Sequence, residues 1–319
     1  MDSQPPPRPE EIAAIFAAVR AELASREWDS IEELEAHMGR FMARQNAAPQ
    51  PDLGGLTPDE LAQVLYGDWR GPGPLRVVRE LPLAEIEAAP WFLVARTLMT
   101  LIQRHGPIKA TQAGNLPRSV VRLFLDGILS TESRERFGDA GLGSINEQDM
   151  SVIHIPRVLL EISKLIRNKK GRFVLTREGR ALLPDDRAGE LYAVLFEACF
   201  RGLDLAYLDG APEAPVFQQL IGYALVRLRD LAGEWIPARD VDERALHPGV
   251  RPEVPVPSPL WDPIETLVET RLLLPLERFG LVERREVPRE PLKYPRDEVR
   301  KNPLYDRFLV DGRLRVMRG

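Results

Sequence analysis

The chain has one cysteine, four histidines and no long apolar run, and each shortage argues against a class of protein. A single thiol, Cys199, cannot form an internal disulfide or a thiolate metal cage. No apolar stretch approaches the roughly 20 residues that a membrane-spanning helix needs. The N-terminal MDSQPPPRPEE has no apolar segment of the kind found in secretory signals. We therefore expect a cytoplasmic protein without a membrane partner, in which Cys199 is a buried thiol.

The signatures of common enzyme classes are also missing, because no Walker, HExxH, GxSxG or CxxC pattern occurs. GDAGLGS (138–144) lacks the third glycine of a dinucleotide fingerprint. His37, His105, His154 and His247 are scattered, without the spacing of a metal site. We predict no catalytic, cofactor-binding or metal site. An enzyme whose site is assembled from residues distant in sequence stays an alternative.

What the chain does have is length and helical periodicity. Its 319 residues suffice for two or three domains. Residues 191–208 are apolar on nearly all sides, which predicts a central core helix. The predicted fold class is mostly α with small β-hairpins (α+β), with helical lobes around a winged-helix domain and a second, less regular winged-helix-like segment. The predicted parts are an N-terminal helical lobe, the winged-helix domain, a central helical segment with a linker, and the C-terminal segment, at residues 1–89, 90–186, 187–257 and 258–319.

The winged-helix prediction depends on the order of elements between residues 91 and 183. The pattern reads helix, short strand, helix, helix, strand, basic turn, strand, helix. LTREGRALL (175–183) closes this order and resembles the LTxxGxxLL phrase that ends the wing in many bacterial winged-helix regulators. In this phrase Thr176 caps the next helix, and Gly179 allows close packing in its first turn.

Three further phrases resemble a set of bacterial proteins of unknown function. They are GNLPR (114–118), LAYLDGAPEAP (205–215) and FGLVE (279–283). The likeness spans most of the chain and implies one integrated unit, with no activity to carry over.

The C-terminal segment predicts a second hairpin. Gly280 occupies the C-cap position of a helix over about 262–279, so a strand at 281–287 should follow directly. This strand should pair with residues near 298–301, which leaves PREPLKYP (288–295) as the irregular tip.

Charge is distributed unevenly along the chain. Residues 90–184 contain 15 Arg and Lys against 8 Asp and Glu, a net charge of +7, whereas the whole chain carries −5 and the remainder therefore −12. A basic module in an acidic protein predicts a nucleic-acid surface, with the wing contacting phosphates while a helix enters the groove. The candidate nucleic-acid-binding residues are Arg118, Arg122, Arg157, Lys164, Arg167, Lys169, Lys170, Arg172 and Arg177.

The favoured function at this level is a DNA-associated, regulator-like protein that uses its basic wing for phosphate contacts and carries no cofactor. The alternative is a non-enzymatic protein-interaction scaffold of the same fold, because basic hairpin turns are often just solvated tips and the predicted third helix is largely apolar. Arg157 on that helix is the candidate for contact with a base edge. The sequence leaves the oligomeric state open.

Overall fold

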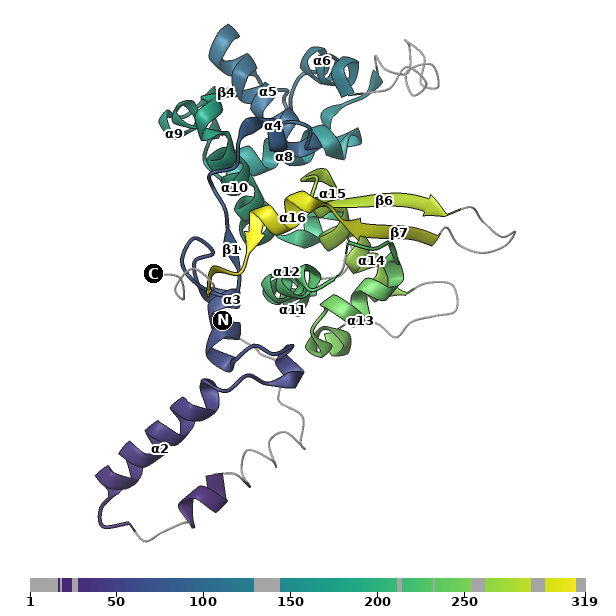
Figure 1. Cartoon of the computed structure of the whole chain (residues 1–319). Coiled ribbons are helices and arrows are strands. Elements are labelled where there is room, and N and C mark those ends of the chain that lie inside the picture. Colours follow the sequence, from purple (N-terminus) through teal and green to yellow (C-terminus); the bar gives the residue numbers. More distant parts are fainter. Residues whose placement is uncertain are drawn as a thin grey trace.

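Helices make up most of the molecule, and its strands form only small antiparallel sheets (Figure 1), which confirms the predicted mostly α fold with small β-hairpins. The computed structural model describes residues 17, 19–24, 28–128, 144–210, 214–231, 233–253, 262–287 and 296–313. Two of the sequence features above, all of GDAGLGS (138–144) except Ser144 and the predicted hairpin tip 288–295, lie outside these residues.

In the N-terminal part, helix α2 follows a few described helical residues (17 and 19–23) and extends away from the rest of the chain at the lower left of Figure 1. Helix α3 follows and has a complete capping box, in which the Thr57 hydroxyl accepts from the Glu60 amide and the Glu60 carboxylate accepts from the Thr57 amide. Pro58 supplies the first helical residue. The elements of this part are α2 (Ile31–Asn46), η1 (Pro51–Leu53), α3 (Pro58–Tyr66), β1 (Arg76–Val77) and α4 (Leu83–Ile86).

The next part, which we call the first module, contains the elements in the order that the sequence predicted. They are α5 (Pro90–His105), β2 (Ile108–Lys109), α6 (Arg118–Ile128), η2 (Glu147–Asp149), α8 (Ser151–Ile162), β3 (Ile166–Asn168), β4 (Arg172–Leu175) and α9 (Arg177–Ala181). The three strands form one antiparallel sheet in the order β2–β4–β3.

Gly179 closes the first module by letting α9 pack against the end of α8. The Thr176 hydroxyl accepts from the Gly179 amide at 3.0 Å, so Thr176 caps α9 as predicted. A Cβ on Gly179 would lie 2.2 Å from the Leu165 carbonyl oxygen, which no side chain tolerates. The glycine of LTREGRALL is therefore required by packing.

The central helix is shorter than predicted. Helix α10 (Ala188–Glu197) continues as a wider π-helical turn, η4 (Ala198–Gly202), and the chain leaves the helix at Leu203, whose backbone is extended. A short 3₁₀ turn, η5 (Leu205–Leu208), follows because the Asp204 carboxylate accepts from the Ala206 amide and starts a new turn. The core assignment itself is confirmed, since Cys199 is fully buried in η4.

The second module follows α10. Its elements are α11 (Pro215–Gln219), α12 (Ile221–Arg229), β5 (Ile236–Pro237), η6 (Ala238–Asp240), α13 (Val241–Ala245), η7 (Pro248–Glu253), α14 (Pro263–Leu267), the π-turn η8 (Val268–Leu273), α15 (Leu274–Arg278), β6 (Val282–Val287), β7 (Arg296–Lys301), α16 (Pro303–Phe308) and β8 (Leu309–Val310). The predicted C-terminal hairpin is confirmed: β6 begins one residue later than expected and pairs with β7, from Val282 opposite Lys301 to Val287 opposite Arg296.

The two modules repeat one topology. Their sheets have equivalent orders, β2–β4–β3 and β5–β7–β6, each preceded by a helix and closed by another. The helix-to-strand connection repeats as well, because the Leu165 amide donates to the Leu160 carbonyl and the Leu281 amide donates to the Leu276 carbonyl. The strand-to-helix connection repeats in the same way: the Thr176 amide donates to Leu165, and the Asn302 amide donates to Leu281.

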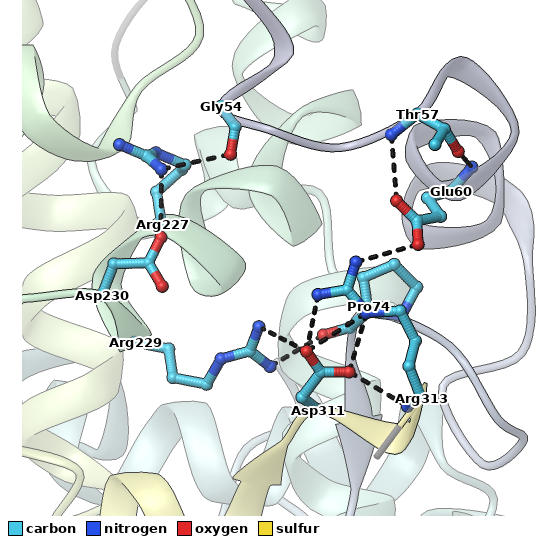
Figure 2. A network of polar contacts seen from close by, with 9 residues as sticks. All are labelled: Gly54, Thr57, Glu60, Pro74, Arg227, Arg229, Asp230, Asp311 and Arg313. Atoms are coloured by element: carbon cyan, nitrogen blue, oxygen red, sulfur yellow. Dashed lines mark hydrogen bonds and ion pairs between the residues drawn. The ribbon is translucent and has the colours of Figure 1, made fainter. Parts of the chain in front are cut away.

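The N-terminal part is tied to the last described residues of the chain. Strand β1 pairs with β8, and Arg313 donates to Asp311 at 2.6 Å and to Glu60 at 2.8 Å (Figure 2). Arg229 at the end of α12 donates to the Pro74 carbonyl at 2.8 Å and lies 3.6 Å from Asp311. These contacts join α3, α12 and the C-terminal segment, so segments far apart in sequence form one unit.

Candidate nucleic-acid interface

The hairpin of the first module turns through two residues with left-handed backbone. Lys170 has φ of 54° and Gly171 has φ of 72°, the signature of a type I′ turn. The Lys169 amide donates to the Arg172 carbonyl at 2.8 Å, and the Arg172 amide donates back to Lys169 at 3.2 Å. Lys-Lys-Gly-Arg therefore forms a tight two-residue connection that presents three cationic side chains, Lys169, Lys170 and Arg172, at the tip.

The register of the sheet decides which side chains share a face. Phe173 is fully buried and lies opposite both Ile108 and Asn168, so these three positions share the face that turns toward the core. Successive side chains of a strand point to opposite faces, whereas direct cross-strand partners point to the same face. Lys109 and Arg172 are direct partners and consequently share the outward face.

Two more cations share that outward face. Lys169 faces Arg172 across the turn, and Arg167 lies opposite Val174, two residues along each strand. We call this surface the outward face of the first sheet; its cations are Lys109, Arg167, Lys169 and Arg172. All four side chains are exposed, and none of them is ion-paired to another described residue. Lys109 was not among the sequence candidates, because only the register of β2 against β4 places it beside Arg172.

Five other candidates extend this face or lie apart from it. Lys170 at the turn is exposed, as are Arg177 at the start of α9 and Lys164 between α8 and β3. Arg118 and Arg122 are exposed on α6, and Arg118 donates to Asn146 at 3.0 Å. Helix α6 lies on the other side of α5 from β4 and α9 in Figure 1, so the structure does not bring this pair together with the hairpin cations.

Arg157 does not lie at the surface, and the expectation that it faces a groove is wrong. Its residue is 7% exposed, its Nε donates to Glu147 at 2.8 Å, and its Nη1 donates to Glu161. The rest of α8 is nearly as inaccessible, since every residue from Ile153 to Arg157 is buried. Helix α8 packs against α5 and α10 and therefore belongs to the core, which is why its sequence is so apolar.

Arg157 belongs to a buried polar cluster with Glu147 and His154, which the sequence did not predict. Glu147 is 0% exposed, and its carboxylate accepts from Arg157, from His154 and from the Leu116 amide. Burial alone would raise the pKa of Glu147, but these donors and the Arg157 charge hold it below the ordinary value. His154 and Arg157 are one turn apart on α8, which is the signal that sequence reading missed.

The sheet of the second module has the equivalent strand order, but its outward face carries different side chains. On its outward face Arg285 pairs with Glu298 at 2.5 Å, and Arg300 pairs with Glu283 at 2.6 Å. Both guanidinium groups also lie over the Trp235 ring, 4.4 and 4.7 Å from its centroid. Arg285 and Arg300 are therefore neutralised by their own neighbours, and an aromatic ring covers them.

Cofactor and membrane features can be assessed only in the described part of the chain. There, no group of three or more His, Cys, Asp or Glu side chains is arranged to hold a metal ion. The carboxylates Glu265 and Glu269, one turn apart, do not form such a group, and Glu269 instead pairs with Arg284. No described helix combines the length and apolar character needed to cross a membrane.

Residues 87–189 match the family model described as the Y4jL N-terminal domain. The matched segment runs from just before α5 into the start of α10 and so includes the whole first sheet. Neither a curated protein nor a solved structure matches the chain. This similarity covers about a third of the sequence, and its description names no activity.

Proposed function

We propose that the first module is a winged-helix domain that binds the phosphate backbone of duplex DNA through its wing and the outward face of the first sheet. The observation that carries the proposal is the placement of Lys109, Arg167, Lys169 and Arg172 on one exposed face. Because no described carboxylate pairs with them, they remain available to a polyanion. Lys170 at the turn adds a fifth charge at the tip.

The proposed binding is independent of DNA sequence. Base edges are read by side chains that reach into a groove, whereas phosphate contacts position the protein without sequence information. Helix α8, which would enter the groove in a winged-helix regulator, is buried in this chain. Among the described residues of the first module, the surface that is left supplies cations to phosphates and no element that reads bases.

The test is a binding titration with two short duplexes of unrelated sequence at several salt concentrations. Each neutralised phosphate releases condensed counterions, so log K should fall with log salt with a slope of about −0.9 per contact. We expect equal affinity for both duplexes and a slope of about −3.6 to −4.5, from about four or five contacts. Replacing Lys169 and Lys170 by Ala should flatten the slope by about two units. No binding to either duplex at low salt would overturn the proposal.

A protein partner is the second candidate, and the burial of α8 is the observation that favours it. A winged-helix domain without a free recognition helix still presents its sheet, and a cationic face fits an acidic protein surface. The same titration separates the two candidates, because a protein-docking face does not need affinity for duplex DNA at low salt.

A further inference from the structure

The segment LAYLDG, part of a phrase that the proposed function does not use, lies between the two modules. Tyr207 on η5 bonds to His154 on α8, with 2.6 Å between the phenol oxygen and Nε2. Two residues later, Asp209 pairs with Arg271 on η8 at 2.8 and 3.0 Å. One short segment thus binds α8 of the first module and η8 of the second.

The Tyr207 contact is the outer end of a three-part chain. Glu147 Oε1 lies 2.8 Å from His154 Nδ1, and His154 Nε2 lies 2.6 Å from the Tyr207 oxygen. An ionised carboxylate only accepts hydrogen bonds, so Nδ1 must carry the proton. In the neutral imidazole, Nε2 then has the free lone pair and accepts from the Tyr207 hydroxyl.

A guanidinium nitrogen of Arg157 also approaches Nδ1, at 3.3 Å. It does not change the tautomer, because the carboxylate contact is shorter and would be repulsive without a proton on Nδ1. Arg157 donates to Glu147 through its Nε and keeps that carboxylate ionised. His154 is consequently a base that a buried anion holds in one orientation.

The two ends of the chain differ in their exposure. Glu147 is 0% exposed and His154 is 8% exposed, whereas Tyr207 is 52% exposed. A hydroxyl bonded to an imidazole that a carboxylate orients is the arrangement that activates nucleophiles in enzymes with unrelated folds. Tyrosine is among the side chains that act as nucleophiles in this way.

We infer that Tyr207 is a base-assisted nucleophile, a modification site that accepts a phosphoryl or sulfonyl group from an electrophile with a leaving group. The phenol oxygen forms a bond to the phosphorus or sulfur atom, and the bond from that atom to the leaving group breaks with its electron pair. The phenol proton passes to Nε2 of His154, which returns it to solvent. The aryl ester is the product, and no oxidant or reductant takes part.

This site is independent of the cationic sheet face, and the chain contains its own control. Tyr66 on α3 is 63% exposed and has no hydrogen-bond partner among the described residues. It is as accessible as Tyr207 and lacks the imidazole. Tyr192 and Tyr305 are fully buried and do not compete for a reagent.

The test uses an arylsulfonyl fluoride on the full chain, with mass spectrometry to measure adduct formation at each tyrosine. General-base assistance contributes about 10²-fold or more, and we expect Tyr207 to react at least about tenfold faster than Tyr66. Labelling of Tyr207 at the rate of Tyr66 or slower would overturn the inference without any variant.

A variant then separates assistance by the base from simple binding of the probe. His154→Gln keeps a polar side chain but removes the basic nitrogen, and it should reduce the Tyr207 rate to about that of Tyr66. His105→Gln, at the exposed end of α5, is the matched control and should change neither rate. Circular dichroism verifies that His154→Gln is folded. If folded His154→Gln keeps the fast Tyr207 rate, the Tyr207–His154 hydrogen bond only holds η5 in place and the inference is overturned. If the variant does not fold, the comparison of Tyr207 with Tyr66 in the wild-type chain decides.

Discussion

The two sheets of this molecule have the same strand order and opposite electrostatic character. In the first sheet, four exposed cations on the outward face have no carboxylate partner in the described part of the chain. In the second sheet, the outward Arg285 and Arg300 are each paired to a glutamate of the neighbouring strand and stacked on Trp235. The topology therefore does not decide what a module can bind. The side chains on one face decide it, and they differ at equivalent positions.

The modules also differ in how α8 of the first and η8 of the second are held, and the largest change in stability should come from the contact that holds η8. Arg271 is 1% exposed, and Asp209 supplies its bidentate partner. Asp209→Ala removes the bidentate carboxylate partner of a buried guanidinium and should lower the free energy of unfolding by about 3–5 kcal/mol in urea denaturation. Asp204→Ala, in the same segment, removes only a turn cap and should cost about 1 kcal/mol. An equal loss of unfolding free energy in the two variants would show that the Asp209–Arg271 pair does not hold η5 to η8.

Glycine packing should give the next largest effect. Gly179→Ala places a methyl group against the Leu165 carbonyl and should destabilise the chain by roughly 2–3 kcal/mol. Gly127→Ala is the matched control, since a Cβ there meets nothing within 4 Å in helix α6. That variant should stabilise by about 0.5–1 kcal/mol, because alanine favours the helix. Thermal melts of both variants measure these changes in stability. If Gly179→Ala leaves the stability unchanged, α9 can shift away from the Leu165 carbonyl.

Acid should weaken the first module through Glu147. The folded pKa of this carboxyl lies below its ordinary value of 4.5, so its ionised form stabilises the fold above that pH, and the contribution is lost as the pH falls toward the folded pKa. The pKa of Glu269 in the second module is shifted in the opposite direction, because burial raises it above the ordinary value. We expect Glu147→Gln to be less stable than wild type at neutral pH and the difference to narrow below about pH 4.5 in urea titrations. A difference in stability between the two proteins that stays constant with pH would exclude a contribution from the ionisation of Glu147.

The smallest effect should come from charge removal on the two outward faces. Lys109→Ala with Arg172→Ala removes unpaired exposed charges and should change stability by less than about 0.5 kcal/mol. Arg285→Ala with Arg300→Ala removes two exposed ion pairs and two contacts with Trp235, and should cost about 1–2 kcal/mol. Equal and negligible costs in urea denaturation would show that the second face is not stabilised by its pairs.

The sequence predicted the elements of this fold better than their exposure. Periodicity and turn chemistry suffice for the hairpins, because Lys-Lys-Gly-Arg and the Gly280 C-cap are local signals. The burial of Arg157 was missed because its partner Glu147 comes from a different turn of the chain, ten residues earlier. Lys109 was missed for a related reason, since only cross-strand register places it beside Arg172. Local pattern does not specify which distant carboxylate neutralises a given cation.

The break at Leu203 shows the same limit in the core. An apolar run from 191 to 208 reads as one helix, yet the chain turns out of it so that Tyr207 and Asp209 reach helices on both sides. The contacts that Tyr207 and Asp209 make with the two modules therefore outweigh the preference of residues 191–208 for one continuous helix.

The central claim is that the first sheet binds phosphates and the second does not, and one measurement tests it most directly. Two variants with equal loss of charge, Lys109→Ala with Arg172→Ala and Arg285→Ala with Arg300→Ala, are compared with wild type in duplex binding across about 50–200 mM salt. The account predicts a slope flatter by about two units for the first variant and an unchanged slope for the second. Equal flattening in both variants, or none in the first, would contradict it.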